Sequence, residues 1–261
     1  MLFNSLTFWL YLPVVLGLYW TIPQQRINLR NAFLLAASYF FYGFWDMRFL
    51  GLILLSTAVD YCTARSMENA SNRQRKFALF ISVLVNLGIL GYFKYANFFL
   101  QSMYDLLAIF GMSSSFRSLD LILPIGISFY TFQSMSYTID VYRNRIQVER
   151  NPLSFALFVA FFAQLMAGPI ERAQTLLPQL NKVRNWDSEE VFSGFSRFIL
   201  GMVKKIVVSG PLYAWTLPLF LNPHLRSTEE TWLIGIFFVL YVLMDFSGYS
   251  DMAIGLSLIH I

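Results

Sequence analysis

Apolar runs long enough to cross a bilayer recur along the whole chain, and they constrain its fold more than any other feature. Roughly eight segments approach the ~17–25 apolar residues of a spanning helix. They are residues 5–22, 31–45, 49–64, 77–93, 95–111, 121–142 and 152–168, and a region at 191–256 that holds at least two. Lipid offers no partner to backbone N–H and C=O groups, so such segments must be helical. The sequence therefore predicts an all-α fold, a polytopic transmembrane helical bundle.

The composition excludes several other classes of protein. Hydrophobic residues make up 57% of the chain and charged residues 13%, whereas a soluble domain carries about 25% charged residues. The single cysteine, Cys62, excludes a disulfide framework and a paired-cysteine metal site. Two histidines, His224 and His260, are too few for a histidine-based metal cluster. The net charge of +4 indicates no nucleic-acid partner, because the basic residues lie in short linkers between apolar runs.

The basic linkers predict an orientation. Positive residues favour the cytoplasmic side, and they gather as Arg26 and Arg30; as Arg65, Arg73, Arg75 and Lys76; and as Arg143, Arg145 and Arg150. The N-terminal segment has no basic region and no small-residue cleavage motif, so it is predicted to be a retained first span that begins outside. If the second and third linkers are both cytoplasmic, the chain crosses the membrane an even number of times between them. Three apolar segments lie there, so one segment within 77–111 is predicted not to cross. Residues 94–97 (KYAN) point to 95–111 as a helix along the outer interface.

Residues 121–143 carry a polar stripe within an apolar segment. On a helical wheel, one narrow face collects Gly126, Tyr130, Gln133, Tyr137, Asp140 and Asn144. A charged group in hydrocarbon costs roughly 2.5–3.5 kcal/mol, so this face is predicted to line a bundle interior or a water-filled cavity. Helix packing is the alternative for Ser128, Thr131 and Ser136, and a pair with Arg143 is the alternative for Asp140. For Tyr130, Gln133 and Asp140 the cavity is favoured.

A second group of polar residues follows the apolar run 152–166. Gly-Pro at 168–169 ends that helix and delivers Glu171 and Arg172 to the membrane boundary. The two side chains form either a local ion pair or, in the functional interpretation, an arginine for phosphate or carboxylate recognition. His224 is read as a loop histidine.

The region 191–256 carries the remaining polar residues. Its first part is predicted to be a broken helix or two short ones, because Lys204, Lys205, Gly210, Pro211 and Pro218 interrupt residues 191–221. The two lysines either snorkel to the head groups or line a path for the phosphates of a nucleotide-bearing donor. Further on, Asp245 and Tyr249 share one helix face, and Ser247 and Asp251 share another. These side chains require a cavity or a polar helix contact, and a supporting hydrogen-bond role is favoured over acid–base catalysis.

Four ordered motifs resemble the membrane-bound O-acyltransferase superfamily. They are LPIGISFYTFQSMSYTIDVYR (123–143), AGPIER (167–172), GMVKKIVV (201–208) and DFSGYSDMAIGL (245–256). The nearest branch resembles the bacterial alginate O-acetyltransferases, with the D-alanyl-lipoteichoic-acid transfer proteins as relatives. The opening residues 1–20 and GYFKYANFF (91–99) fit the same branch.

The resemblance implies a bundle of broken or re-entrant helices around an intramembrane tunnel in the bacterial inner membrane. It implies no bound cofactor, and a cytoplasmic acyl thioester, acetyl-CoA, as donor. The acetyl group would pass to an extracytoplasmic polysaccharide such as alginate, with periplasmic or membrane partner proteins. Tyr130, Gln133 and Asp140 are the candidates for the tunnel lining, and Arg172, Lys204 and Lys205 for donor phosphate contact. Asp245, Tyr249 and Asp251 complete the candidate set.

The chain departs from the family pattern at its end. The family centres on a histidine, suited to general-base work by its pKa, in a Trp-His-Gly type motif well beyond the SGYSDMAIGL segment. Residues up to Ile261 contain no such motif, so no catalytic residue is assigned and His260 is not taken for the family histidine. Residues 1–256 are interpreted as the N-terminal part of one membrane domain and 257–261 as a non-native tail. We therefore expect this chain to be inactive as it stands. A transporter or flippase, or a non-catalytic membrane docking subunit, is the rival interpretation.

Overall fold

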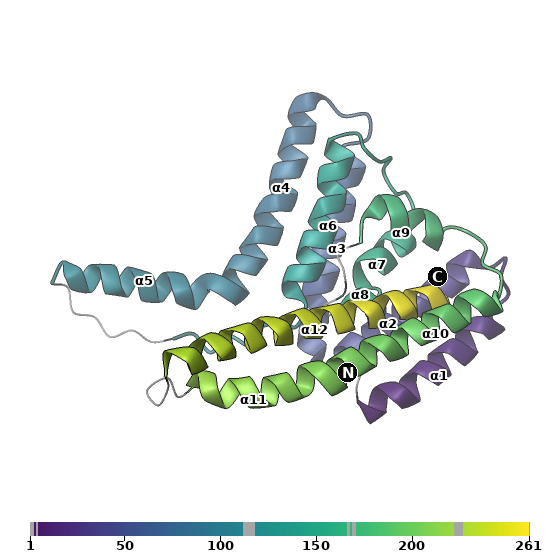
Figure 1. Ribbon diagram of the computed structural model, residues 1–261. Coiled ribbons are helices and arrows are strands. Elements are labelled where there is room, and N and C mark those ends of the chain that lie inside the picture. Colours follow the sequence, from purple (N-terminus) through teal and green to yellow (C-terminus); the bar gives the residue numbers. More distant parts are fainter. Residues whose placement is uncertain are drawn as a thin grey trace. The chain divides into compact units, whose positions relative to one another are not determined.

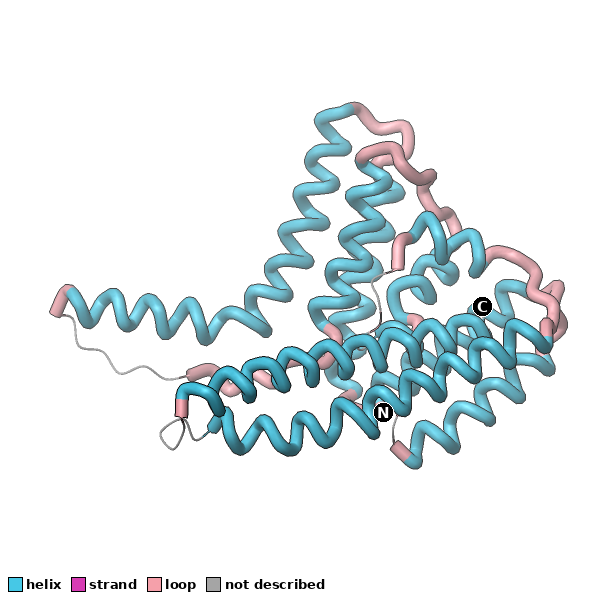
Figure 2. The backbone as a smooth tube through the Cα atoms, in the orientation of Figure 1, coloured by secondary structure: helices cyan, strands magenta, loops and turns pink. Residues whose placement is uncertain are grey.

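A computed structural model describes residue 3 and residues 5–111, 118–165, 168, 171–221 and 227–260. Every regular element in these ranges is a helix, which confirms the predicted all-α class (Figure 2). The α-helices are α1 (Leu6–Thr21), α2 (Ile27–Gly43), α3 (Leu50–Ser66), α4 (Asn72–Leu90), α5 (Ala96–Ile109), α6 (Ile127–Tyr142), α7 (Pro152–Ala160), α8 (Phe162–Leu165), α9 (Ala173–Leu180), α10 (Ser188–Val203), α11 (Gly210–Leu221) and α12 (Thr228–His260). A 3₁₀ turn, η1 (Met47–Phe49), and two π-helical turns, η2 (Gly91–Tyr95) and η3 (Lys204–Ser209), join them.

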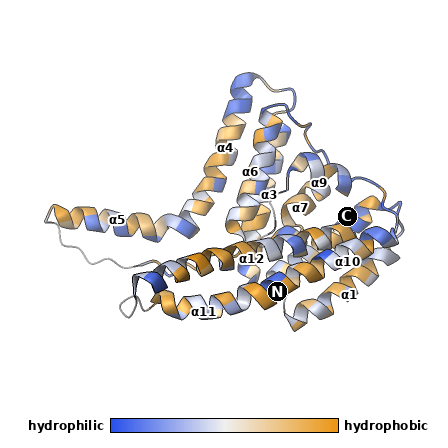
Figure 3. Ribbon diagram, in the orientation of Figure 1, coloured by the Kyte–Doolittle hydropathy of each residue, from blue (hydrophilic) through white to orange (hydrophobic). Residues whose placement is uncertain are grey.

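Three of these helical stretches are long and apolar enough to span a membrane. They are Met47–Ser66, Asn72–Ile109 and Thr228–His260, and Leu6–Thr21 and Pro152–Leu165 are shorter apolar helices. Figure 3 shows the apolar character along much of α12 and the hydrophilic residues at the start of α4. Apolar side chains also cover outward faces, as Leu6, Leu10 and Val14 do on α1, each at least 60% exposed. Such faces are suited to lipid, and the chain is a membrane protein.

The chain divides into two compact units. Unit 1 comprises Met1–Trp45, Phe161–Pro169 and Gln179–Ile261, and unit 2 comprises Asp46–Ala160 and Ile170–Pro178. In unit 2, α3, α4 and α6 pack against one another, and the chain turns at η2 so that α5 leaves the direction of α4 (Figure 1). The placement of 95–111 along an outer interface stays a prediction.

In unit 1, the continuous helical run α10–η3–α11 lies along α12 (Figure 1). Two pairs of glycines bring the backbones together. A Cβ at Gly201 would lie 2.4 Å from the Gly248 carbonyl oxygen, and one at Gly255 would lie 2.5 Å from the Gly194 carbonyl oxygen. Close approach of this kind is what small residues allow in membrane helix pairs.

The expected break within 191–221 is a π turn instead of an interruption. The chain stays helical from Ser188 to Leu221, and the Gly210 N–H donates to the Lys205 carbonyl in the wider π register. Pro211, which follows, has no N–H to donate. A local π adjustment is a known way to accommodate such a residue in a membrane helix, so the register shifts just before Pro211, and Pro218 lies within α11 without ending it.

The segment 121–142 also differs from expectation, because α6 begins only at Ile127. Gly126 caps it with φ of 75°, a left-handed conformation that glycine adopts without strain, and Asn144 lies beyond its end with φ of 56°. These two residues therefore leave the predicted stripe. The 16 residues of α6 rise about 24 Å, less than the ~30 Å hydrocarbon core.

Candidate functional site

The four remaining stripe residues of α6 all face the interior of unit 2. Tyr130 and Gln133 are 1% and 3% exposed. The Gln133 amide donates to the Phe158 carbonyl oxygen at 2.6 Å. That carbonyl belongs to the last turn of α7, where helical carbonyls have no intrahelical partner. Gln133 thus satisfies the end of a neighbouring helix, which is one reason for a polar group at this depth.

The C-terminal end of the stripe opens toward polar loops. The Tyr137 hydroxyl accepts from the Glu149 N–H at 2.9 Å. Asp140 lies 3.6 Å from the guanidinium of Arg145, so the arginine beside it is Arg145 and not Arg143, the partner in the alternative interpretation. The sequence spacing suggested Arg143 because it is one helical turn away, but α6 ends before that residue and the chain reverses.

A polar hollow of about 810 Å³ lies at this end of unit 2. It is lined by residues of the two connecting loops and the ends of their helices: Met67, Glu68, Asn69, Arg75, Val141 and residues 144–150. Arg75 donates through Nη2 to the Val141 and Tyr142 carbonyl oxygens at 2.9 and 2.8 Å, and to Asn144 Oδ1 at 2.7 Å. Its charge thereby caps the C-terminus of α6, where a cation is favourable.

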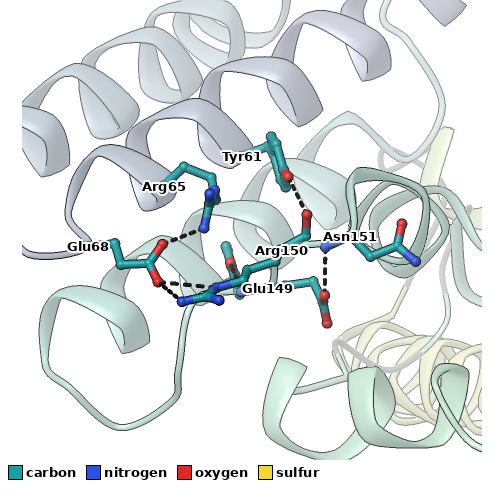
Figure 4. Close-up of polar contacts among 7 residues, drawn as sticks. Tyr61, Arg65, Glu68, Glu149, Arg150 and Asn151 are labelled. Carbon is teal, nitrogen blue, oxygen red and sulfur yellow. Dashed lines mark hydrogen bonds and ion pairs between the residues drawn. The ribbon is translucent and has the colours of Figure 1, made fainter.

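Glu68 is the hub of the polar contacts beside this hollow (Figure 4). Arg150 donates to Glu68 Oε1 through Nη2 at 2.6 Å and through Nε at 3.2 Å, and Arg65 pairs with Oε2. The Tyr61 hydroxyl donates to the Arg150 carbonyl at 2.7 Å. Hydrogen bonding to Arg150 holds the pKa of Glu68 below its usual value. The loop 144–151 is therefore tied to α3 by charge and by backbone contact.

The structure contains a buried hydrogen-bond network centred on Asp60, which the sequence analysis did not predict. Both Asp60 carboxylate oxygens accept from the Asn86 amide, at 3.0 and 2.9 Å, and Oδ1 also accepts from the Ser82 hydroxyl at 2.5 Å. The Ser56 hydroxyl donates to Asn86 Oδ1 at 2.7 Å and lies 3.1 Å from the Ser134 hydroxyl. The available signal was the spacing: Ser56 and Asp60, Ser82 and Asn86, and Ser134 and Thr138 are all i, i+4 pairs in apolar runs.

The two lysines and the aspartates of the last motifs meet in unit 1. Lys204 Nζ lies 2.5 Å from Asp251 Oδ2 and 3.0 Å from Ser247 Oγ. Lys205 Nζ lies 2.5 Å from Asp245 Oδ1. Adjacent residues of an α-helix point about 100° apart, but here both begin the π turn η3 and both reach α12. The structure shows interhelical ion pairs, a contact that neither sequence interpretation of these lysines included.

Further contacts surround these pairs. Arg197 Nε donates to Asp251 Oδ1 at 3.1 Å, and the Ser209 hydroxyl donates to Asp245 at 3.1 Å. The Tyr249 ring stacks on Phe3 with centroids 4.8 Å apart. Each lysine thus has its own carboxylate, and a phosphate would have to displace one of them. π turns within α-helices occur frequently at functional sites.

The remaining sequence candidates lie elsewhere. Arg172 is exposed, and its carbonyl accepts from the Thr175 N–H at 2.9 Å as α9 begins in unit 2. Residues 167, 169 and 170 of its motif, and His224, lie outside the described residues. His260 is buried at the end of α12, with Nδ1 2.8 Å from the Leu256 carbonyl oxygen.

Comparison with known proteins supplies the family. The chain is 42% identical over 263 residues to the probable alginate O-acetylase AlgI of Pseudomonas aeruginosa, which covers 99% of this chain and 49% of that protein. It is 40% identical over 261 residues to the Azotobacter vinelandii protein of the same name, covering 99% and 51%. A Helicobacter pylori peptidoglycan O-acetyltransferase is 31% identical over 288 residues, covering 99% and 54%. No protein-family model matches the chain.

These relatives show that the chain belongs to the membrane-bound O-acyltransferase family, in the branch of the alginate O-acetylases. The chain spans about half the length of the curated relatives that it matches.

Proposed function

We propose that the complete protein is a membrane O-acyltransferase that transfers an acetyl group from a cytoplasmic acyl-CoA thioester to an extracytoplasmic polysaccharide. The homology to two probable alginate O-acetylases and a peptidoglycan O-acetyltransferase, along 99% of this chain, carries this proposal. Alginate is the acceptor that we propose first, because the Pseudomonas aeruginosa and Azotobacter vinelandii relatives carry that name. Partner proteins at the periplasmic face would complete the transfer.

The arrangement of charges supports a cytoplasmic donor side. Arg73, Lys76 and Arg143 are exposed at the end of unit 2 that holds the polar hollow. Excess positive charge favours the cytoplasmic face of a membrane protein. In this proposal the stripe residues Tyr130, Gln133 and Asp140 line part of the acyl-donor path, and Arg172 contacts donor phosphates.

The ion pairs of unit 1 belong to the same proposal in a modified form. Lys204 and Lys205 are each balanced by an aspartate, so donor phosphate would compete with Asp251 and Asp245 for them. Their placement on a π turn supports a functional role, because such turns are frequent at functional sites. Tyr249 supports the same helix pair through its stacking on Phe3.

The test uses the complete protein in liposomes with acetyl-CoA labelled in the acetyl group. Thioester loss with transfer to added polysaccharide supports an enzyme, whereas solute flux without thioester loss identifies a carrier. If the protein shows neither thioester loss nor solute flux, it is a docking subunit. Gln133→Ala and Lys204→Ala should each lower acetylation at normal expression, and exposed Arg73→Gln serves as the matched surface control. Unchanged acetylation in both variants contradicts their assignment to the donor path.

A further inference from the structure

The buried side chain of Arg30 contacts the partly buried Arg184 at one end of unit 1. Arg30, in the first turn of α2, is only 3% exposed. Its guanidinium carbon lies 4.4 Å from the Tyr19 ring centroid and 4.8 Å from that of Trp20. Its Nη1 donates to the carbonyl oxygen of Arg184 at 3.2 Å. Cation–π contacts of this kind hold the guanidinium in place, but they do not neutralise its charge.

Several unpaired donors gather here. Arg30 Nε and Nη2, Arg184 Nη1 and Trp20 Nε1 are buried and have no hydrogen-bond partner within the described part of the chain. Arginine and the tryptophan indole can donate but cannot accept. A buried donor without a partner is costly, and more so when it is charged. These donors outnumber the one unpaired acceptor found beside them among the described residues, Nε2 of His260, and a negatively charged acceptor fits them best.

The charges that surround the pair do not supply this acceptor. Among the residues that the structure describes, the ion pairs include neither Arg30 nor Arg184. Two carboxylates lie beside Arg184. Asp187 accepts from the backbone N–H groups of Glu189 and Glu190 at 2.8 and 3.3 Å, where it caps α10. The charge of Glu190 favours the charged form of Arg184, but no ion pair joins the two among the described residues. Burial and, to a smaller extent, the charge of Arg30 lower the pKa of Arg184 to about 10. An anion would relieve both effects.

The site has room for one atom and lies among interfacial side chains. A hollow of about 20 Å³ is lined by Trp20 and Arg184, and also by Asp187 and Glu190, and it has room for one water-sized atom. Arg30 does not line this hollow but contacts two residues that do, Trp20 and Arg184. Trp20 packs edge-on against Trp186, with ring centroids 4.9 Å apart. Tryptophans gather at the level of lipid head groups, and basic pockets between membrane helices on the cytoplasmic side receive anionic head groups. Exposed Arg26 lies one turn before Arg30 on the same side.

We propose that Arg30 and Arg184 form an anion site that receives an oxygen of a phosphate group at the membrane surface. The phosphate of an anionic phospholipid is one source, and free inorganic phosphate is the other. Guanidinium groups suit this ligand because they bind phosphate oxygens through paired N–H donors. The proposal does not depend on acyl transfer and can be tested on the chain of 261 residues itself.

The test measures thermal unfolding of the purified chain in nanodiscs of phosphatidylcholine, with and without phosphatidylglycerol, and in detergent with and without inorganic phosphate. Stabilisation by phosphatidylglycerol alone identifies a lipid head group, and equal stabilisation by inorganic phosphate identifies a free anion. Either result supports the site if Arg30→Gln and Arg184→Gln abolish it. No stabilisation by either ligand overturns the proposal.

Native mass spectrometry gives a second readout that tolerates a less stable variant. We expect wild type to retain phosphatidylglycerol at least about tenfold more than phosphatidylcholine, as a charge-assisted bidentate contact would give. Arg26→Gln, which removes an exposed arginine at the same end, should keep this preference. Arg30→Lys should keep part of it, because charge remains while the planar fork is lost. An Arg30→Gln chain with the wild-type preference would show that the site does not exist.

Discussion

The two carboxylate oxygens of Asp60 share the amide of Asn86, at 3.0 and 2.9 Å, although α3 and α4 are both apolar helices. Asp60 and Asn86 are fully buried. Because a buried carboxylate needs hydrogen-bond donors to remain in hydrocarbon, this pair fixes how α3 faces α4. It is the contact in unit 2 on which stability should depend most directly.

Replacing Asn86 with leucine should therefore destabilise the protein. The change leaves the Asp60 carboxylate short of donors, and we expect a loss of about 1–3 kcal/mol in the free energy of unfolding. Asp60→Asn should cost less, because it removes the charge that needs the donors. Denaturant unfolding in detergent measures both, with Leu84→Ala on the exposed face of α4 as control. An Asn86→Leu protein no weaker than this control would contradict the importance of the network.

Gly201 should not tolerate alanine. A Cβ there would lie 2.4 Å from the Gly248 carbonyl oxygen, so α10 and α12 would have to separate. Overpacking of this kind costs about 1–3 kcal/mol. Gly235 on α12 has nothing within 4 Å of an added Cβ, so Gly235→Ala should be neutral or stabilising through helix propensity. Thermal unfolding of the two variants in parallel makes the comparison, and equal midpoints would count against close helix contact.

Lys204 and Asp251 should be energetically coupled. Their side chains are 29% and 13% exposed and lie 2.5 Å apart, so solvent screens them less than a surface pair. A double-mutant cycle with Lys204→Met and Asp251→Asn should give a coupling of about 0.5–3 kcal/mol. The exposed Arg48–Asp46 pair, with Arg48 72% exposed, should give a smaller coupling in the same kind of cycle, because solvent screens it. Coupling no larger than in that pair would show that Lys204 is free to bind other anions.

Acid should weaken the connection between loop 144–151 and α3. Arg150 lowers the pKa of Glu68 in the folded protein relative to the unfolded chain. The carboxylate therefore stabilises the fold above its ordinary pKa of about 4.3, and this contribution is lost as the pH falls through the lowered pKa. Between pH 7 and pH 3, the melting temperature of the wild-type protein should fall further than that of the Glu68→Gln variant. Parallel pH profiles of the two proteins would refute this role of Glu68.

How far the sequence could predict the fold and the site is clear from particular residues. Gly126 and Asn144 seemed to belong to the polar stripe because an ideal helix was drawn through 121–144, yet both have positive φ and lie outside α6. Helical spacing offered Arg143 as the alternative partner of Asp140, whereas a reversal of the chain brings Arg145 to it. The role of Asp60 could not be predicted from the sequence, because its hydrogen-bond partners lie on two other helices, α4 and α6.

The sequence by itself determined that the protein is helical, that it belongs in a membrane, and which family it joins. These properties follow from local apolar runs and ordered motifs, which need no knowledge of packing. The tertiary structure decided which polar groups meet: Gln133 with the end of α7, Asp60 with Asn86, each lysine of η3 with its own aspartate, and Arg30 with Arg184. Burial makes each of these groups depend on a partner distant in sequence, and such partners are set only when helices pack.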